Sequence, residues 1–440
     1  MSDRYARINH GYMDEKDCNN YAPQDKPQAC LDGSADAQTA VAVEQFISNG
    51  LTFLTSSMVG SLSDEYGRKG ILLLGVFLAT LSPLFLLLIQ IHPHMSPIWY
   101  YTVGALQGLV NWMAVALSAL SDVMPPQWRA ASFGMVMAGF SVGFACAPQL
   151  ALLLGHFNVT ILSLTVVMVA FVVILVFFPE TLPEAAAARA QLVRLEQVAD
   201  LTGREKYLWY MARPFRELSI LNRSEIFRML SLMAFVSGIS SSGSQSLLLY
   251  YIEERIGFDD KDIAVLFSVI GFCGIFIQVV VLKIANDLMG ERRVLIFSFA
   301  VGAMHAVLYA VATKKFLIYV AAALASLLMM SFPTISAIKS NNVNSTEQGR
   351  IQGALYSVQA LASSVGPSIF RVVYHYTKDG QLLGAGSMFL VATVFYVAAS
   401  ICAYFLPPEA NSRRAEDPAE SSPPDPTDPE PEIGADTPLI

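Results

Sequence analysis

Apolar runs of about 20 residues recur along most of this chain, and no other feature restricts its fold as strongly. A helix needs roughly 20 mostly apolar residues to cross a bilayer. The runs are bounded by charges, Pro or Gly, and their approximate spans are 41–62, 71–91, 98–123, 131–155, 159–178, 227–252, 263–286, 293–313, 316–338, 351–374 and 385–406. With 54% hydrophobic and 15% charged residues, the chain is not a soluble enzyme, a nucleic-acid-binding protein or a disordered polypeptide. The sequence therefore predicts an all-α polytopic membrane protein.

Polar segments divide these runs into two groups. Residues 181–226 are rich in Arg and predict a cytoplasmic linker between an N-terminal bundle, 41–180, and a C-terminal bundle, 227–406. Most Lys and Arg beside the runs then lie on the linker side, as the positive-inside rule requires, and residues 1–40 lie on the opposite side. Because neither residues 1–40 nor residues 407–440 contain an apolar run, we expect both ends to be disordered.

The five cysteines show no metal-ligand spacing. Cys146, Cys273 and Cys402 lie inside apolar runs and are expected to pack as small hydrophobic residues. Cys18 and Cys30 form a disulfide if their segment is extracytoplasmic, or they are free thiols. The sequence also lacks a nucleotide-binding loop and a catalytic triad, so we expect no cofactor, no metal and no enzymatic activity.

The two groups of runs share a loop motif. After the first run the chain reads Gly60-x-x-x-Asp64-x-x-Gly67-Arg68-Lys69, and Asp287 and Gly290 follow the seventh run 223 residues later. Arg129 and Pro148 correspond to Arg350 and Pro367, at displacements of 221 and 219. Two homologous bundles joined by a basic cytoplasmic linker are typical of a transporter whose halves rock about a central site.

The first loop resembles the cytoplasmic signature between helices 2 and 3 of the major facilitator superfamily. Two further stretches, Pro179–Glu184 and Glu347–Leu355, are similar to its tetracycline-antiporter-like branch, and in particular to hippocampus-abundant-transcript-like transporters. The resemblance extends from about Ala37 to Pro407. It implies a secondary carrier that moves a small organic solute by alternating access, with or without proton coupling. An uncoupled facilitator of sugars or related solutes, and a scaffold or receptor without transport activity, stay open as alternatives.

The chain departs from the family plan at its start. Family members have six plus six helices, and the signature loop follows helix 2, whereas here it follows the first recognisable run. We therefore expect helix 1 to be missing from this sequence, and the visible runs to be helices 2 to 12. A truncated gene prediction and a natural eleven-helix protein are the two explanations.

The resemblance also implies a cytoplasmic gate. Asp64 is expected at the N-terminal end of helix 11, and Arg68 beside Asp122, while Lys69 would contact lipid headgroups. Gly60 would permit close approach of two helices, and Gly67 a tight turn. The complete expected set is Gly60, Asp64, Gly67, Arg68, Lys69, Asp122, Arg129, Asp287, Gly290 and Arg350.

Polar residues inside the runs are expected to face the bundle interior, because lipid offers them no hydrogen-bond partner. The substrate-lining candidates lie on helices 2, 4, 7 and 11, and they are Glu44, Asn49, Gln107, Asn111, Gln245, Gln352, Tyr356 and Gln359. Any one of them fits equally well into a hydrogen-bonded seam between helices. The expected partners are a small-molecule solute, membrane lipid and, in a coupled carrier, protons. We expect a monomer that binds no nucleic acid, in a membrane that the sequence does not specify.

Overall fold

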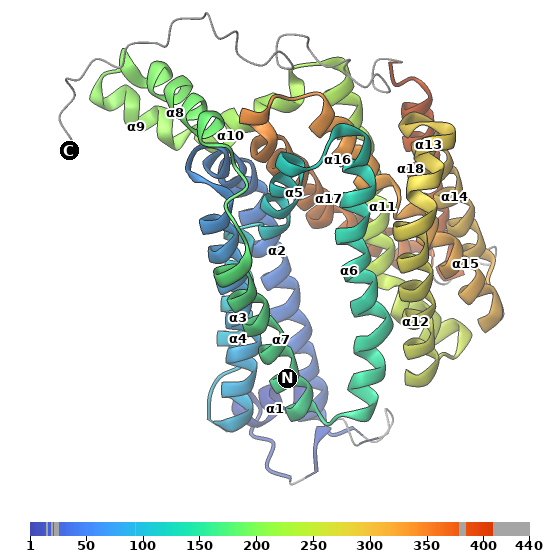
Figure 1. Ribbon diagram of the computed structural model, residues 1–440. Helices are drawn as coiled ribbons and strands as arrows, with labels where there is room; N and C mark the ends of the chain where they lie inside the picture. The colour runs from blue at the N-terminus through green and yellow to red at the C-terminus, as the bar shows by residue number, and fades with distance from the viewer. Residues whose placement is uncertain (15, 19–20, 22–25, 93, 378–383, 408–440) are drawn as a thin grey trace, which may run out of the picture.

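The computed structural model describes the whole chain except residues 15, 19–20, 22–25, 93, 378–383 and 408–440 (Figure 1). The described residues form helices and no strand, which confirms the all-α prediction. The predicted disorder of residues 408–440 lies outside the described residues. In chain order the helices are α1 (Ser2–Asn9), α2 (Gln28–Tyr66), α3 (Arg68–Ile91), α4 (Ile98–Leu106), η3 (Gln107–Leu109), α5 (Trp112–Val123), α6 (Pro126–Leu153), α7 (His156–Phe177), α8 (Glu184–Ala199), α9 (Gly203–Met211), α10 (Arg213–Leu218), η4 (Ser219–Asn222), α11 (Glu225–Tyr251), η5 (Ile252–Ile256), α12 (Asp260–Phe276), η6 (Ile277–Val281), α13 (Leu282–Met289), α14 (Glu291–Val311), α15 (Lys315–Leu328), α16 (Ser331–Asn341), η7 (Ser345–Glu347), α17 (Gln348–Thr377), η8 (Gly384–Gly386) and α18 (Ser387–Tyr404).

Nine helical stretches among the described residues are long and apolar enough to cross a membrane. They coincide with nine of the predicted runs, so the chain is a multi-pass integral membrane protein. The other two predicted runs lie in α2 and α17, which are 39 and 30 residues long and more polar. These two helices lie side by side and pack against each other. Their polarity is tolerated because each faces the other helix as well as lipid.

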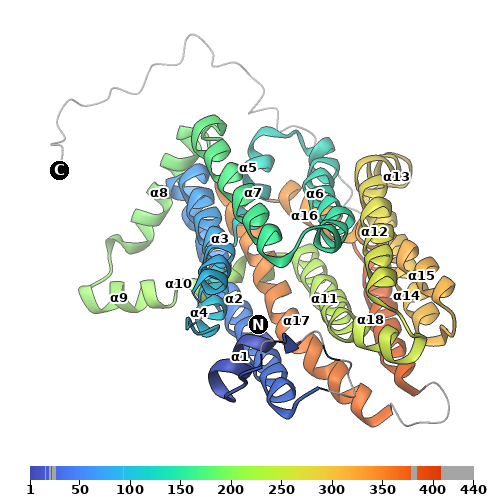
Figure 2. The same cartoon turned by 90° about the horizontal axis from the view of Figure 1, so that it is seen from below.

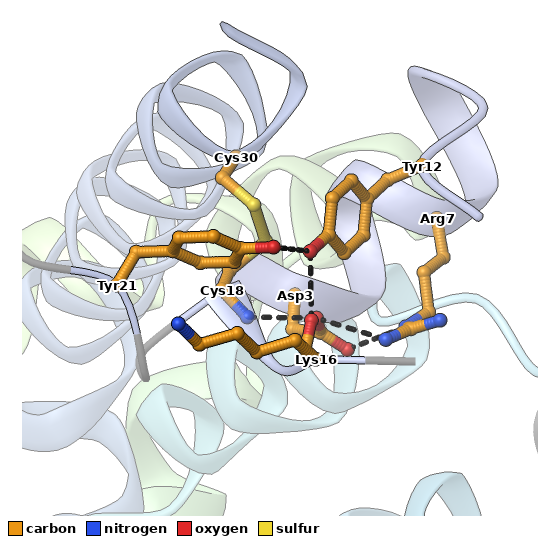
Figure 3. The surroundings of a disulfide bond; sticks show 7 residues. All are labelled: Asp3, Arg7, Tyr12, Lys16, Cys18, Tyr21 and Cys30. Atoms are coloured by element: carbon orange, nitrogen blue, oxygen red, sulfur yellow. Dashed lines mark hydrogen bonds and ion pairs between the residues drawn. A yellow bond between two sulfur atoms is a disulfide. The ribbon is translucent and has the colours of Figure 1, made fainter. Parts of the chain in front are cut away.

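The N-terminal segment is ordered where the structure describes it, so the prediction of disorder there is wrong. Cys18 and Cys30 form a disulfide (Figure 3). Tyr12 donates a hydrogen bond to the carbonyl of Lys16, and the backbone N–H of Cys18 donates to Asp3. The disulfide joins the segment before α2 to the first turn of that helix. Helix α2 begins at Gln28 rather than near residue 41. Amino-acid composition alone does not reveal this covalent cross-link, which stabilises the folded segment.

Helix α1 packs across the outer part of α2 and reaches the neighbouring helices. A Cβ on Gly33 would lie 2.6 Å from the backbone nitrogen of Ala6, so only glycine allows this crossing. The rings of Tyr5 and Tyr101 stack with centroids 6.3 Å apart. Arg4 donates to the carbonyl of Ile89 at 2.7 Å, at the end of α3. The segment therefore caps the end of the bundle opposite the linker (Figure 1).

The helices form two groups, α2–α7 and α11–α18, seen from the N-terminal end in Figure 2. The second group surrounds a continuous core that includes Phe299, Phe370 and Phe389, all fully buried. The groups meet where α2 packs on α17 and where α6 packs on α12. Helices α8 and α10 pack on α2 at the end of the bundle opposite α1, and they position charged residues described below.

Candidate cytoplasmic gate

Helices α2 and α17 approach each other backbone to backbone near the end of the bundle that carries the linker helices. A Cβ on Gly60 would overlap the carbonyl oxygen of Gly349, and a Cβ on Gly349 would overlap the carbonyl of Gly60. One turn further along, Gly353 stands in the same relation to Ser56. Small residues allow this spacing, as they do in other membrane helix pairs. The two halves are therefore in direct backbone contact at this level.

Asp64 lies at the start of α17. Its two carboxylate oxygens accept hydrogen bonds from the backbone N–H groups of Gly349 at 2.7 Å and Arg350 at 2.8 Å. The first N–H groups of a helix have no partner within the helix, and the helix dipole favours a negative charge there. A carboxylate from the N-terminal half therefore caps a helix of the C-terminal half.

Arg68 lies beneath this contact and is fully buried. Its guanidinium pairs with Asp64 at 2.7 Å and with Asp122 at 2.9 Å, and it donates to the hydroxyl of Ser63 at 2.7 Å. A buried charge is stable only when it is paired and hydrogen-bonded. Arg68 thus holds the Asp64 carboxylate while Asp64 holds α17.

The turn between α2 and α3 is held by Glu180, in the segment between α7 and α8. Gly67 has φ = 100°, a conformation that favours glycine. Its neighbour across the turn, Glu180, accepts hydrogen bonds from the backbone N–H groups of Arg68 at 2.8 Å and Lys69 at 3.1 Å. Burial raises the pKa of Glu180, but the hydrogen bonds from these N–H groups, and from those of Thr181 and Leu182, outweigh it and hold the pKa below the usual 4.5. Glu180 was not among the predicted gate residues, although it lies in a stretch that carried the family resemblance.

Arg129 makes a second connection between the halves. Its guanidinium donates to the carbonyl of Ser340 and to the side chain of Asn341, each at 3.1 Å. It also donates to the carbonyls of Ser121 and Met124 in its own half. Arg129 therefore links the start of α6 to the end of α16.

A further ion network, which sequence reasoning missed, connects the linker to both halves. Glu65 in α2 pairs with Arg194 of α8 and, at 2.8 Å, with Arg213 of α10. Glu217 of α10 pairs with Arg194 at 3.1 Å and with Arg350 of α17 at 2.8 Å. The Arg-rich composition of the linker indicated a cytoplasmic location, but it gave no sign of these partners, which are far apart in sequence.

The second-half counterparts of the gate residues lie elsewhere. Asp287 pairs at 2.6 Å with Lys283 one turn earlier, and its side chain is 48% exposed. The Lys283 amine lies 4.3 Å from the ring centroid of Trp128, at the start of α6. Gly290 has φ = 79° and precedes α14. The repeated motif therefore keeps its turn but does not repeat the buried carboxylate contact.

Four of the substrate-lining candidates have partners in neighbouring elements. Gln352 exchanges hydrogen bonds with Ser336 of α16. Gln107 donates to Ser82 of α3 at 2.6 Å, and Asn111 caps the first turn of α5. The ring of Tyr356 packs edge-on against Phe332, with centroids 5.4 Å apart. The contacts of Gln352, Gln107 and Tyr356 lie between helices, whereas that of Asn111 lies within the first turn of its own helix.

The other four candidates differ in exposure. Glu44 is half-buried against α4, where a Cβ on Gly104 would overlap its carboxylate. Asn49 and Gln359 are half-buried, and Gln245 is exposed. Among these residues, Glu44 is the one ionisable side chain.

Comparisons with known proteins agree with this geometry. The family model described as Major Facilitator Superfamily matches residues 34–367 and, in an overlapping second match, residues 230–431. The human Hippocampus abundant transcript 1 protein is 24% identical over 330 residues, which cover 74% of this chain and 64% of that protein. The class H tetracycline resistance protein of Pasteurella multocida is 24% identical over 353 residues, 79% of this chain and 82% of that protein.

A solved structure shows the same fold. The human organic anion transporter TETRAN superposes with a TM-score of 0.65 and 20% sequence identity, over 82% of this chain and 83% of that chain. This chain spans 64% of the length of the human hippocampus-abundant-transcript relative, less than two thirds. The matched family model covers most of the chain, and the signature loops and paired helix groups are in place. The chain belongs to the major facilitator superfamily.

Proposed function

We propose that this protein is a secondary transporter that moves a small organic solute by alternating access, and that the conformation described here is closed toward the cytoplasm. The observation that carries the proposal is the contact of Asp64 with the backbone of Gly349 and Arg350. It joins the two halves through a buried charge, in addition to the hydrophobic cluster in which Leu117 and Phe133 pack with Ala337. Such a contact can break and reform as a unit when the halves, residues 41–180 and 227–406, rock against each other.

The class of solute rests on the relatives. Their names refer to tetracycline resistance and to transport of organic anions, and small organic molecules are the chemistry that these names share. We propose Glu44 as the group that would carry a proton in a coupled cycle, because it is a half-buried carboxyl group in the membrane-spanning part of α2. In an uncoupled facilitator, uptake would not depend on a proton carried by Glu44.

The test is uptake by the purified full chain in proteoliposomes. A panel of small organic solutes is applied with and without a pH gradient, for the wild type, Glu44→Gln and Asp64→Asn. We expect saturable uptake of at least one solute, its near-loss in Asp64→Asn, and loss of only the gradient-driven accumulation in Glu44→Gln. Saturable uptake that ignores the gradient identifies an uncoupled facilitator. A well-folded chain without uptake of any solute contradicts transport and favours a scaffold or receptor.

A further inference from the structure

The linker helix α9 exposes an apolar face that no described part of the chain covers. Tyr207, Leu208 and Met211 are 64%, 56% and 62% exposed, and none of the residues of α9 is buried. Leu208 and Met211 follow Tyr207 by one and four positions, so the three residues lie on one side of the helix. A nine-residue helix without a buried face gains little stability from its own hydrogen bonds. This face therefore requires a partner outside the described chain.

The opposite side of α9 contacts the ion network that connects the linker to both halves. Trp209 lies beneath two guanidinium groups, with the central carbon of Arg216 3.4 Å and that of Arg194 5.0 Å from its ring centroid. Arg194 is itself paired with Glu65 of α2. Because Trp209 is fixed on the protein side, the apolar face made by Tyr207, Leu208 and Met211 is turned away from the bundle.

The position of α9 indicates what covers that face. In Figure 1, α9 lies at the end of the helix bundle opposite α1 and to one side of α2 and α3. In Figure 2, it lies outside the outline of the membrane-spanning helices. The two views together place α9 above the region that lipid occupies beside the N-terminal half. The preceding helix α8 also exposes Leu192 and Leu195, which are three residues apart.

Basic residues border the apolar face. Arg204 is exposed on α9, three residues before Tyr207 and four before Leu208, and Arg189 is exposed on α8. An interfacial helix typically combines aromatic and aliphatic residues on one face with Lys or Arg beside them, and it binds anionic headgroups. We propose that α9, with the adjoining Leu192 and Leu195 of α8, is a membrane-surface anchor that inserts Tyr207, Leu208 and Met211 into the anionic cytoplasmic leaflet.

The depth of α9 in a bilayer tests this proposal independently of transport. Cys146, Cys273 and Cys402 are replaced by Ser, the Cys18–Cys30 disulfide is kept, and a nitroxide is attached to Leu208→Cys in the full chain. The matched control is Lys206→Cys, because residue 206 lies on roughly the opposite side of the helix. Both proteins are studied in nanodiscs of phosphatidylcholine, alone or mixed with phosphatidylserine.

We expect the label at position 208 to be several-fold more accessible to oxygen and several-fold less accessible to a water-soluble nickel complex than the label at position 206. We also expect this difference to increase with phosphatidylserine, and the increase to disappear when Arg204→Gln is added. Equal nickel accessibility at both positions would overturn the proposal, as would protection of position 208 that persists in lipid-free amphipol. The latter result would indicate a protein surface as the partner.

Discussion

The two signature loops share a sequence frame and make opposite kinds of contact. In the first, Gly60 and Gly349 bring α2 and α17 together at the backbone, and Asp64 is buried in the contact. The displacement of 223 between the loops places Lys283 at the position of Gly60. The displacement of 221 between Arg129 and Arg350 likewise places Trp128 at the position of Gly349. A glycine pair at the first contact thus corresponds to a cation–π pair at the second.

This difference shows that the repeated Asp and Gly do not determine what a loop does. Lys283 stands at the position that corresponds to Gly60, and it forms an ion pair with Asp287 in its own helix. Its contact with Trp128 is between side chains at 4.3 Å, and a cation–π interaction at an exposed site contributes about 0.5–1 kcal/mol. The first loop therefore lies where the halves meet backbone to backbone, whereas the second loop contacts the other half through side chains.

The largest effect is expected from the two carboxylates. Asp64→Asn removes one partner of a buried ion pair, which costs roughly 3–5 kcal/mol, whereas Asp287→Asn removes an exposed pair worth about 0–1 kcal/mol. The readout is maleimide labelling, from the cytoplasmic side, of a cysteine at the buried position Ser340, in a background without the free cysteines. We expect labelling to accelerate at least about a hundredfold for Asp64→Asn and less than about fivefold for Asp287→Asn, since each 1.4 kcal/mol is a factor of ten. Similar rates for both variants would show that the loops contribute equally to closure.

The second prediction concerns the residue that differs between the loops. Gly60→Ala places a methyl group against the carbonyl of Gly349, and overpacking of this kind costs about 1–3 kcal/mol. Lys283→Ala creates no clash, so its cost should stay near the exposed ion-pair and cation–π limit of about 1 kcal/mol. We expect Gly60→Ala to speed labelling at position 340 and to lower uptake, with little change for Lys283→Ala. If the two variants behave alike, backbone contact is not what distinguishes the first gate.

A third prediction concerns the support that Glu180 gives to the first loop. Glu180→Gln weakens the cap on α3, and loss of such a cap costs about 1 kcal/mol. Because the pKa of Glu180 is lowered on folding, its stabilising contribution is present above about pH 4.5, the ordinary value, and is lost as the pH falls through the depressed pKa. Thermal unfolding in detergent should therefore show a deficit for Glu180→Gln at neutral pH that shrinks in acid. A deficit that does not depend on pH would mean that the charge of Glu180 is not what stabilises the turn.

The smallest effect is expected for Trp128→Ala. This change removes the aromatic partner of Lys283 but leaves the Lys283–Asp287 pair and the Arg129 contacts intact. We expect labelling at position 340 to change by less than about fivefold, consistent with about 0.5–1 kcal/mol for the cation–π contact. The matched variant Trp128→Phe should restore most of the wild-type rate. A large effect of Trp128→Ala would mean that the second loop is a gate in its own right.

Helix identity could be predicted from the sequence, while the partners of polar residues could not. The runs that became α3, α7 and α14 were recognisable because length and apolarity are local properties. By contrast, Gln107, Asn111 and Gln352 were selected as cavity residues on polarity alone, and in the structure they make hydrogen bonds within and between helices. Polarity inside a membrane helix shows that a partner exists, but it does not identify the partner.

The prediction that the N-terminal segment is disordered was wrong for a related reason. Residues 1–40 lack an apolar run, yet α1 is held by the Cys18–Cys30 disulfide and by packing of Ala6 on Gly33. A cross-link and a glycine at a helix crossing stabilise a polar segment without a large hydrophobic core.

The sequence by itself determined the helical membrane fold, the basic linker and the two signature turns, because apolar length, charge bias and glycine conformation depend on residues close together in the chain. Only the tertiary structure decided which loop makes a buried carboxylate contact between the halves. Asp64 and the N–H of Gly349 are 285 residues apart, and their contact depends on Gly60 leaving room for α17. The positions that correspond to Gly60 and Gly349 are held by Lys283 and Trp128. The second Asp–Gly motif therefore has no such close helix contact, and Asp287 is exposed.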